Sequence, residues 1–382
     1  MEYLIRNRFK KNLIYLIDCV GKIVVPVPIR SRIENPKKIL VIRLDHIGDV
    51  LMTTPFIKSL KRCFPDTSIT LVVKKWAYDV VKDNPYIDKI KVYNSPWTIP
   101  KTEGDAKQGI IGFIKFILEL RKEKYNLAFD LKGDFRSILM IYLSGSKRKI
   151  GYAIRGGGFM LTDIVDYKAE EHGIDKNLSL LKTVNIPNTF REPEIFLSEE
   201  DEGMGLGILD QMNVQRNKRT IGIHAGGASF YKRWPEEKFV ELIALLKRER
   251  EIQILIFGGH YERDIISKIR ERVKENGVFI MPELTLCQMA AAFKRCQVVI
   301  CNDSGPMHVG IAVKTPVAAI FGPTFPDRFG PKDLKMNRVV RPHIDCSPCW
   351  SPDNSIGCKE RTCLKNISVE EVYKAVMELI PS

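Results

Sequence analysis

The chain has 382 residues, of which 45% are hydrophobic and 28% are charged. This composition excludes a disordered or collagen-like chain, and the length predicts two domains of ordinary size. The charge is uneven: residues 1–190 contain 33 Lys and Arg against 20 Asp and Glu, whereas residues 191–382 contain 27 against 26. The basic half predicts an anionic partner, which could be a phosphorylated substrate, a membrane surface or nucleic acid, or else a solvated basic surface without a specific partner.

The first 36 residues form a basic leader, in which Arg8, Lys10 and Lys11 lie among apolar side chains. Such an amphipathic stretch suits an anionic membrane surface, and the alternative is a helix that caps the first domain. The longest apolar stretch, residues 13–29, is interrupted by charged residues and prolines, so we expect neither a transmembrane helix nor a signal peptide. We therefore expect a cytoplasmic protein, and we leave open a peripheral contact with the inner face of the membrane.

After the leader, strand-like and helix-like segments alternate, which predicts parallel sheets covered by helices. In the first half we expect strands at 38–43, 68–73, 90–93 and 127–131, and helices at 50–60 and 109–122. In the second half we expect strands at 220–224, 252–257, 298–301 and 316–321, and helices at 236–249, 261–275 and 285–295. This predicts two α/β domains, residues 37–190 and 219–382, joined by a linker region at 191–218. Two such domains facing each other would bind ligands in one cleft, at the carboxyl ends of their strands.

The turn after the first strand, Arg43-Leu44-Asp45-His46-Ile47-Gly48-Asp49-Val50, opens a helix where active-site groups gather in this architecture. Asp49 could be a general base that takes the proton of a sugar hydroxyl, with Asp45 and His46 as alternatives. The structural alternative is that Asp49 is a plain N-cap of the helix.

The second motif runs from His224 to Glu237 and contains Gly226, Gly227, Lys232 and Arg233. Two glycines let backbone N–H groups approach an anion, and the two cations add positive charge beside them. The motif predicts a phosphate-binding loop, although an ordinary charged surface loop has the same composition.

The third motif, Cys301-Asn302-Asp303-Ser304-Gly305-Pro306-Met307-His308, carries a strand into a helix that begins near Pro306. The N-terminus of that helix is a ready anion site, Ser304 can donate a hydroxyl, and Asp303 can accept from a sugar hydroxyl. The alternatives are that Asp303 and Ser304 are caps and that His308 is a core histidine.

Three further patterns in the sequence are weaker. The basic run Lys147-Arg148-Lys149 is expected on a solvated face, and the glycines at 156–158 predict a flexible loop. Four late cysteines have spacing compatible with a zinc knuckle, and reduced thiols without metal are the alternative: Cys346, Cys349, Cys358 and Cys363.

In order and spacing, the three motifs resemble glycosyltransferase family 9, the lipopolysaccharide heptosyltransferases. The resemblance rests on residues 43–55, Lys232-Arg233-Trp234-Pro235-Glu236, residues 302–308 and Phe321-Gly322-Pro323-Thr324. It implies a GT-B fold, with two Rossmann-like domains facing across a cleft, the acceptor on the first and the nucleotide-sugar on the second. It also implies an inverting, metal-independent transfer of heptose from ADP-heptose to the lipopolysaccharide core. We therefore expect an anionic glycolipid of that core, or a related glycan, as the acceptor, and neither a cofactor nor a nucleic-acid partner.

Carried over to this chain, the resemblance makes Asp49 the catalytic base and Lys232 the lysine that binds the donor phosphate. It also assigns further residues to the donor: Gly226, Gly227, Glu262, Asp303, Ser304, Gly305 and His308. Two other functions remain open at this point, a GT-B-like nucleotide-sugar epimerase and a two-lobed binding module without catalysis. An epimerase would convert the donor alone, and a binding module would have no turnover for Asp49→Asn to abolish.

Overall fold

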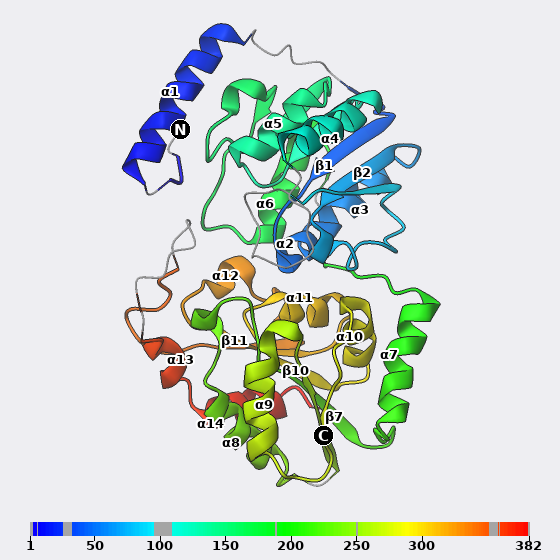
Figure 1. Ribbon diagram of the computed structural model, residues 1–382, viewed down its shortest axis with the longest axis vertical. Helices are drawn as coiled ribbons and strands as arrows, with labels where there is room; N and C mark the ends of the chain where they lie inside the picture. Colours follow the sequence, from blue (N-terminus) through cyan, green and yellow to red (C-terminus); the bar gives the residue numbers. More distant parts are fainter. Residues whose placement is uncertain are drawn as a thin grey trace. The chain divides into compact units, whose positions relative to one another are not determined.

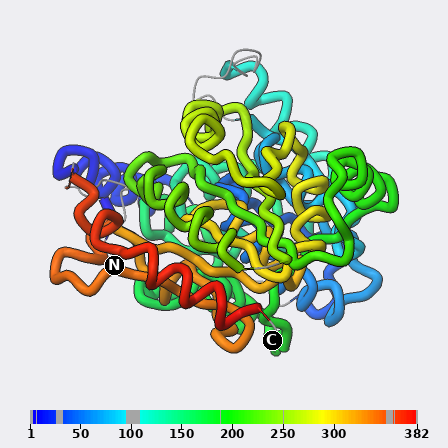
Figure 2. The backbone as a smooth tube through the Cα atoms, turned by 90° about the horizontal axis from the view of Figure 1, so that it is seen from below, coloured from blue at the N-terminus to red at the C-terminus, as the bar shows by residue number. Residues whose placement is uncertain are grey.

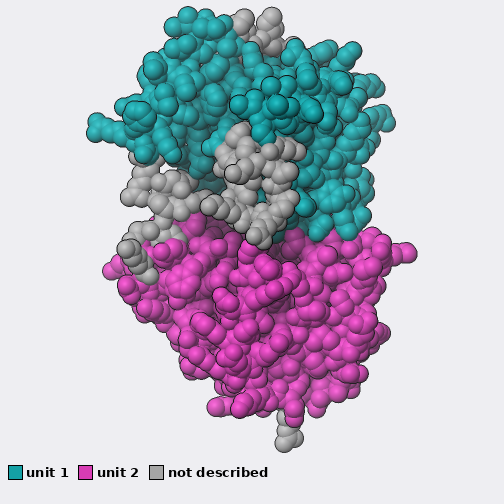
Figure 3. All heavy atoms as spheres, in the orientation of Figure 1, with its two compact units in different colours: residues 1–192 teal, residues 193–382 magenta. Residues whose placement is uncertain are grey.

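The computed structural model describes residues 3–5, 7–25, 33–94, 109–187, 189–249, 251–350, 358 and 360–380. The chain divides into two compact units, residues 1–192 and 193–382, which Figure 3 colours separately. We describe each unit by itself.

The N-terminal unit is built on a parallel six-stranded sheet with the order β3-β2-β1-β4-β5-β6. Its strands are β1 (Lys38–Ile42), β2 (Ser68–Val73), β3 (Lys89–Val92), β4 (Leu127–Asp130), β5 (Arg148–Gly151) and β6 (Asp163–Ile164). β1 is central and apolar, and its residues 39–42 are fully buried because helices cover both faces of the sheet.

The helices of this unit are α1 (Arg8–Val24), α2 (Ile47–Leu51), α3 (Thr54–Cys63), α4 (Ile110–Lys122), α5 (Phe135–Leu143) and α6 (Gly173–Ser179). Leu40 and Ala128 of the sheet pack with α4 and α5 in one core cluster. The next side chain of β4, Phe129, points to the other face, where its ring lies 5.0 Å from that of Phe56 in α3. The alternation along the strands therefore places α4 and α5 on one face and α3 on the other, as Figure 1 shows.

The C-terminal unit repeats this topology, with the order β12-β11-β10-β7-β8-β9, again all parallel. Its strands are β7 (Arg219–His224), β8 (Ile252–Phe257), β9 (Val278–Ile280), β10 (Val298–Asn302), β11 (Val317–Ile320) and β12 (Asn337–Val340). Counted from the first strand of each unit, both sheets have the order 3-2-1-4-5-6 of the Rossmann fold. The expected fold class, two Rossmann-like α/β domains, is confirmed.

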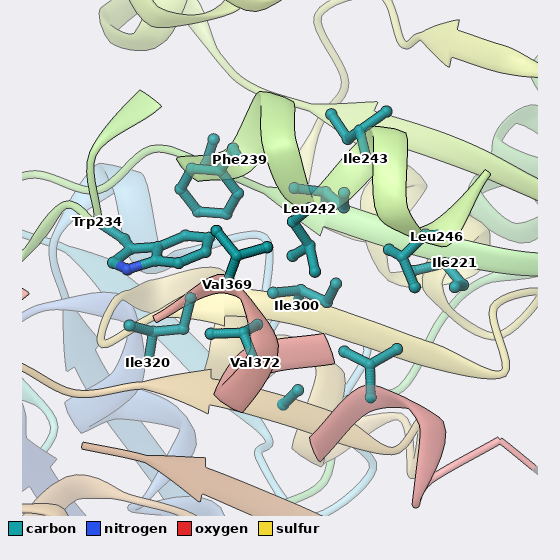
Figure 4. Close-up of a cluster of buried hydrophobic side chains, with 14 of the residues drawn as sticks. Ile221, Trp234, Phe239, Leu242, Ile243, Leu246, Ile300, Ile320, Val369 and Val372 are labelled. Carbon is teal, nitrogen blue, oxygen red and sulfur yellow. The ribbon is translucent and has the colours of Figure 1, made fainter. Parts of the chain in front are cut away.

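The helices of the C-terminal unit are α7 (Glu199–Gln211), α8 (Glu236–Leu246), α9 (Arg263–Arg272), α10 (Leu286–Phe293), α11 (Gly305–Ala312), α12 (Pro326–Phe329), α13 (Thr362–Asn366) and α14 (Val369–Met377). Its core joins Ile221 and Ile300 of the sheet to α8 and to Val372 of α14 (Figure 4). Trp234 is fully buried there, edge-on to Phe239 at 5.0 Å, and its indole N–H donates to the carbonyl of Ile367 at 3.2 Å. Trp234 therefore anchors the second sequence motif in the core.

Two expectations about the helices need revision. The helix expected over 50–60 is two helices, α2 and α3, which meet near Thr53, because Pro55 at the start of α3 cannot continue a preceding helix. Within the predicted linker region 191–218, α7 packs against α10, and Gly205 allows the close contact, since a Cβ atom there would lie 2.7 Å from that of Ala291.

The expectation of a solvated basic run at 147–149 was wrong for Arg148. Lys147 is exposed, but Arg148 lies in β5, is buried, and forms a bidentate ion pair with Asp163 at 2.9 and 3.0 Å. The glycines at 156–158 lie in a turn that contacts α1, with φ of +85° at Gly156 and +87° at Gly157, and the flexibility expected there stays a prediction. Among the described helices, none is long and apolar enough to cross a membrane.

Candidate functional site

Each sheet has one switch point, where the connections that follow two neighbouring parallel strands run toward opposite edges of the sheet. In the N-terminal unit this place lies between β1 and β4, and in the C-terminal unit it lies between β7 and β10. The loops that follow such a strand pair separate and leave a crevice at the carboxyl edge, where α/β proteins of this kind bind ligands. All three sequence motifs follow one of these strands.

In the N-terminal unit, Arg43 organises a cluster of charges after β1. Its Nη2 atom lies 3.1 Å from Oδ1 of Asp49, and its Nε atom lies 3.3 Å from Oδ2 of Asp45. The same guanidinium donates to the carbonyl of Leu131, and Lys132 reaches Oδ1 of Asp45 at 2.8 Å. Arg43 therefore connects the end of β1, the start of α2 and the loop after β4.

The two carboxylates of this cluster differ in their surroundings. Burial alone would raise the pKa of Asp45, but Arg43 and Lys132 outweigh it and hold the pKa well below its usual range. Both oxygens of Asp45 face a cation, so this carboxylate has little basicity. Asp49 is bound by Arg43 through one oxygen, and its side chain is 26% exposed. Of the two, Asp49 is the better candidate for accepting a substrate proton.

The expectation that Asp49 caps the helix was wrong. The N-cap of α2 is His46, which makes no side-chain capping hydrogen bond, and Asp49 lies in the first turn. Its carboxylate binds Arg43 instead. This result removes the structural alternative for Asp49 without testing its role in catalysis.

In the C-terminal unit, Asn302 at the end of β10 holds the loop after β7 in place. Its side-chain amide donates to the carbonyls of Ala225 and Gly226 at 2.8 and 2.9 Å, and its Oδ1 atom accepts from the N–H of Trp234 at 3.0 Å. Arg233 adds a further bond, from its Nε atom to the carbonyl of Gly227 at 2.7 Å. The loop is therefore fixed at both ends by buried or half-buried groups.

The two glycines of this loop lie between two predicted donor-binding residues. A Cβ atom at Gly226 would lie only 2.1 Å from Cγ of Glu262, so this position accepts no larger residue while Glu262 stays in place. The N–H of Gly227 donates to Oε1 of Glu262 at 3.3 Å, and a Cβ atom at Gly227 would lie 3.5 Å from that of Ser304. Gly227 also has a φ of +149°, a value that favours glycine.

Lys232 lies on the same edge of the sheet, in the short helical turn Phe230–Lys232. Its Nζ atom is 2.7 Å from Oδ2 of Asp303 and 4.5 Å from the ring centre of Trp350. Asp303 is buried, whereas the lysine side chain is 21% exposed. An ammonium group has three donors, so Lys232 can bind Asp303 and an anion together.

The third motif runs from β10 into α11, which is the strand-to-helix turn that the sequence predicts. Ser304 is the N-cap of α11, makes no side-chain capping hydrogen bond, and its hydroxyl donates to the carbonyl of Asn302 at 3.2 Å. Gly305 begins the helix, and His308 lies one turn further, buried. The structure thus brings Gly226, Gly227, Lys232, Glu262, Asp303 and Ser304 to one edge of one sheet, which favours an anionic ligand.

The sequence profile of glycosyltransferase family 9 (heptosyltransferase) matches residues 113–360, which include this entire edge. The chain belongs to glycosyltransferase family 9. It is 24% identical to lipopolysaccharide heptosyltransferase 1 of Campylobacter coli, over 90% of this chain and 98% of that protein. It is 25% identical to lipopolysaccharide heptosyltransferase 2 of Escherichia coli K12, over 80% and 88%.

Solved structures agree with this assignment. The family 9 glycosyltransferase of Veillonella parvula superposes with a TM-score of 0.76 and 26% identity, over 91% of this chain and 97% of that one. The E. coli heptosyltransferase WaaC with ADP-2-deoxy-2-fluoro heptose has the same fold, with a TM-score of 0.66 and 18% identity, over 89% and 99%. The chain is therefore a family 9 enzyme with the GT-B fold.

Some residues of this site have no role assigned from the sequence. Asn302 belongs to the third motif without a predicted role. Trp350 lies in a distant segment that is held near the site by hydrogen bonds from the N–H groups of Cys349 and Trp350 to the carbonyl of Pro323, at 2.9 and 2.8 Å. Asp130 ends β4 beside Ile42, and burial raises its pKa to about 7, although the N–H of Gly133 donates to it at 2.7 Å. The sequence does contain a signal for Asp130, because this carboxylate comes near the end of a predicted strand and such strand ends gather ligand-binding groups.

The cysteine expectation is not decided. All nine cysteines are free thiols in the structure, and Cys363 is buried whereas Cys346 and Cys349 are exposed. Within the described ranges, no group of three or more potential ligands is arranged to hold a metal ion. Residues 351–357 and 359, which lie between these cysteines, are outside the described residues.

Proposed function

We propose that this enzyme transfers a heptose from ADP-heptose, with inversion, to an anionic saccharide of the lipopolysaccharide core or a related glycolipid. The similar proteins from C. coli and E. coli are named for heptosyl transfer, and a WaaC structure contains a fluoro analogue of ADP-heptose. The observation that carries the proposal is the arrangement of Lys232, Asp303, Ser304 and the Gly226-Gly227 turn at the carboxyl edge between β7 and β10.

In this proposal, that edge holds the donor. Lys232, the hydroxyl of Ser304 and the N-terminus of α11 stabilise the diphosphate as negative charge develops on it during departure. Gly226 and Gly227 leave room for the diphosphate against the backbone. Glu262 accepts from the ribose hydroxyls, and Asp303 and His308 complete the wall of the donor site beside Gly305.

Asp49 is the proposed general base. It accepts the proton of the acceptor hydroxyl while that oxygen attacks the anomeric carbon and the bond to the diphosphate breaks. Arg43 holds one carboxylate oxygen, and the carboxylate retains lone pairs on the other for the incoming proton. The cluster fixes the direction of Asp49, which is the main requirement for proton transfer in a positioned complex.

The acceptor belongs to the N-terminal unit in this proposal. The excess of Lys and Arg over Asp and Glu in residues 1–190 suits an acceptor that carries phosphates and carboxylates. A lipid-linked acceptor of this kind is presented at a membrane surface, so we also propose a peripheral contact with that surface.

Calorimetry with a panel of ADP-, GDP- and UDP-sugars tests the donor assignment. We expect ADP-heptose to bind most tightly, and a tighter complex with another nucleotide-sugar would contradict it. Incubation with donor alone separates transfer from epimerisation, because an epimerase would convert the sugar whereas a transferase would at most hydrolyse it slowly. Analysis of the anomeric configuration of the product tests inversion.

A further inference from the structure

Helix α1 is attached to the N-terminal unit through its polar side. Oδ1 of Asp18, a buried carboxylate, accepts a hydrogen bond from the backbone N–H of Gly157 at 2.8 Å. The hydroxyl of Tyr3 donates to the other oxygen of Asp18, and the N–H of Leu4 donates to the carbonyl of Ile154 at 2.8 Å. The attachment is therefore specific, because it pairs a buried carboxylate with a backbone donor.

Two glycines allow this close approach. Gly21 in α1 is buried, and a Cβ atom there would lie 2.6 Å from the ring of Phe159. Gly156, with a φ of +85°, faces α1, and a Cβ atom there would lie 2.3 Å from Cγ2 of Ile14. The contact surface of α1 thus includes residues 14, 18 and 21, which share one side of a helix.

The opposite side of α1 is apolar and exposed. Its side chains recur at intervals of three, four or seven residues and are between 47% and 85% exposed: Phe9, Leu13, Leu16, Val20, Ile23 and Val24. On a helix of 3.6 residues per turn they form one face, about 140° away from the docked side. Figures 1 and 2 show α1 at the edge of its unit. A helix of a globular protein normally buries such a face against the core, and α1 does the reverse.

Basic residues border this apolar face. Lys10 lies beside one edge and Arg8 beside the other, and both are exposed. The acid of the helix, Asp18, points into the unit, so the outer surface of α1 carries only positive charge. An apolar face between basic borders is complementary to an anionic bilayer, where the apolar side chains enter the acyl boundary and the cations meet the headgroups.

We propose that α1 is an interfacial helix that binds an anionic membrane surface with Phe9, Leu13, Leu16, Val20, Ile23 and Val24, while Asp18 fastens it to the N-terminal unit. The inference deepens the peripheral contact in the proposed function, because it assigns that contact to one element. It also explains why the apolar face of α1 is exposed. The docked side fixes the orientation of the helix on its unit, and the apolar side provides affinity for the membrane. The 17 residues of α1 lie in the surface and do not span the bilayer.

Co-sedimentation of the full chain with vesicles tests this inference. The vesicles contain 30% phosphatidylglycerol in phosphatidylcholine, or phosphatidylcholine alone, and no donor or acceptor is added. We expect binding to the anionic vesicles, weaker binding to the neutral ones, and a loss of at least about tenfold in the partition coefficient for Leu13→Ser/Leu16→Ser/Val20→Ser. Arg8→Glu/Lys10→Glu should lower binding to anionic vesicles selectively.

A matched control removes equally exposed apolar side chains from the other unit: Met204→Ser/Leu334→Ser/Met336→Ser. This variant should bind vesicles like the wild type, and circular dichroism checks that both triple variants are folded. No vesicle binding by the wild type, or an equal loss in both triple variants, would overturn the inference. So would a dimer in sedimentation velocity that depends on the three α1 residues, because a second copy would then cover the face.

The vesicle assay is independent of the proposed function. A chain that binds vesicles through α1 but transfers no heptose would contradict the proposed reaction and leave this inference standing. A chain that transfers heptose to a soluble acceptor but does not bind vesicles through α1 would support the proposed reaction and contradict this inference.

Discussion

The Nζ atom of Lys232 lies 2.7 Å from Oδ2 of Asp303, so a strand end holds the cation that we propose for the donor diphosphate. We expect Lys232→Ala to weaken binding of ADP-heptose about 10- to 100-fold, because it removes a charged hydrogen bond and leaves the anionic Asp303 facing the phosphates. Calorimetry measures the effect. Lys268→Ala is the control, since Lys268 pairs with Glu236 on the surface of the same unit, and its Kd should equal that of the wild type. Equal Kd values for both variants would refute the role of Lys232.

Asp49→Asn separates catalysis from binding. We expect kcat to fall about 100-fold or more with near-normal donor affinity, because the amide cannot accept the proton but still fills the space beside Arg43. Asp45→Asn is the informative comparison, since Asp45 lies between two cations and should act mainly on folding. Its Tm should fall more than that of Asp49→Asn. A larger kcat loss for Asp45→Asn, with an unchanged Tm, would reverse the assignment.

Asp130 predicts a pH dependence of stability. Burial raises its folded pKa to about 7, against about 4 for an unfolded aspartate, so the folded chain binds a proton that the unfolded chain has lost. The contribution of Asp130 to stability is therefore complete below pH 4 and is lost as the pH rises through 7. Asp130→Asn removes this dependence, and the free energy of unfolding of the wild type relative to the variant should fall by about 2–3 kcal/mol between pH 5 and pH 8. Urea titrations at both pH values measure it, and a constant difference would show that Asp130 stays ionised.

Arg148→Ala should destabilise the N-terminal unit by about 3–5 kcal/mol, because it leaves Asp163 buried without its cation. Lys147→Ala removes an adjacent charge that is exposed, and its effect should stay within about 0.5 kcal/mol. Denaturant unfolding of the two variants gives the comparison. Similar small values would mean that the Arg148–Asp163 pair is dispensable.

Asp18→Ala should release α1 from its unit. The backbone N–H of Gly157 loses its acceptor, so amide hydrogen exchange in residues 153–160 should become faster. Donor binding should not change, because it belongs to the other unit in our proposal. Asn12→Ala serves as the control, since Asn12 is exposed on the same helix and should leave this exchange unaltered. Protection that persists in Asp18→Ala would show that other contacts hold the helix.

The central strands and the three motifs could be predicted because their signals are local. A buried parallel strand such as Val317–Ile320 is a continuous apolar run, and the residues after it reach the carboxyl edge by topology alone. Strands away from the centre of the sheet carry weaker signals. Arg148–Gly151, between β4 and β6, begins with a cation whose ion-pair partner, Asp163, lies in another strand. The charge of Arg148 therefore predicted an exposed side chain, whereas the fold buries it against Asp163.

The residue types of the candidate site could be predicted from the sequence, but the contacts between them could not. Pro55 could have indicated the break between α2 and α3, since proline favours the first turn of a helix. By contrast, the three hydrogen bonds of Asn302 and the contact of Trp350 with Lys232 join segments far apart in sequence. Such contacts follow from tertiary packing, which no local pattern encodes.

The amide of Asn302 has a thermodynamic consequence for the first encounter with a ligand. It ties three backbone groups of the loop after β7 while the chain folds, so the conformational entropy of that loop is lost once, before any nucleotide arrives. A preorganised loop leaves more of the contact energy for affinity. Association should therefore resemble rigid docking, with a rate set by diffusion and charge and not by slow ordering of the loop.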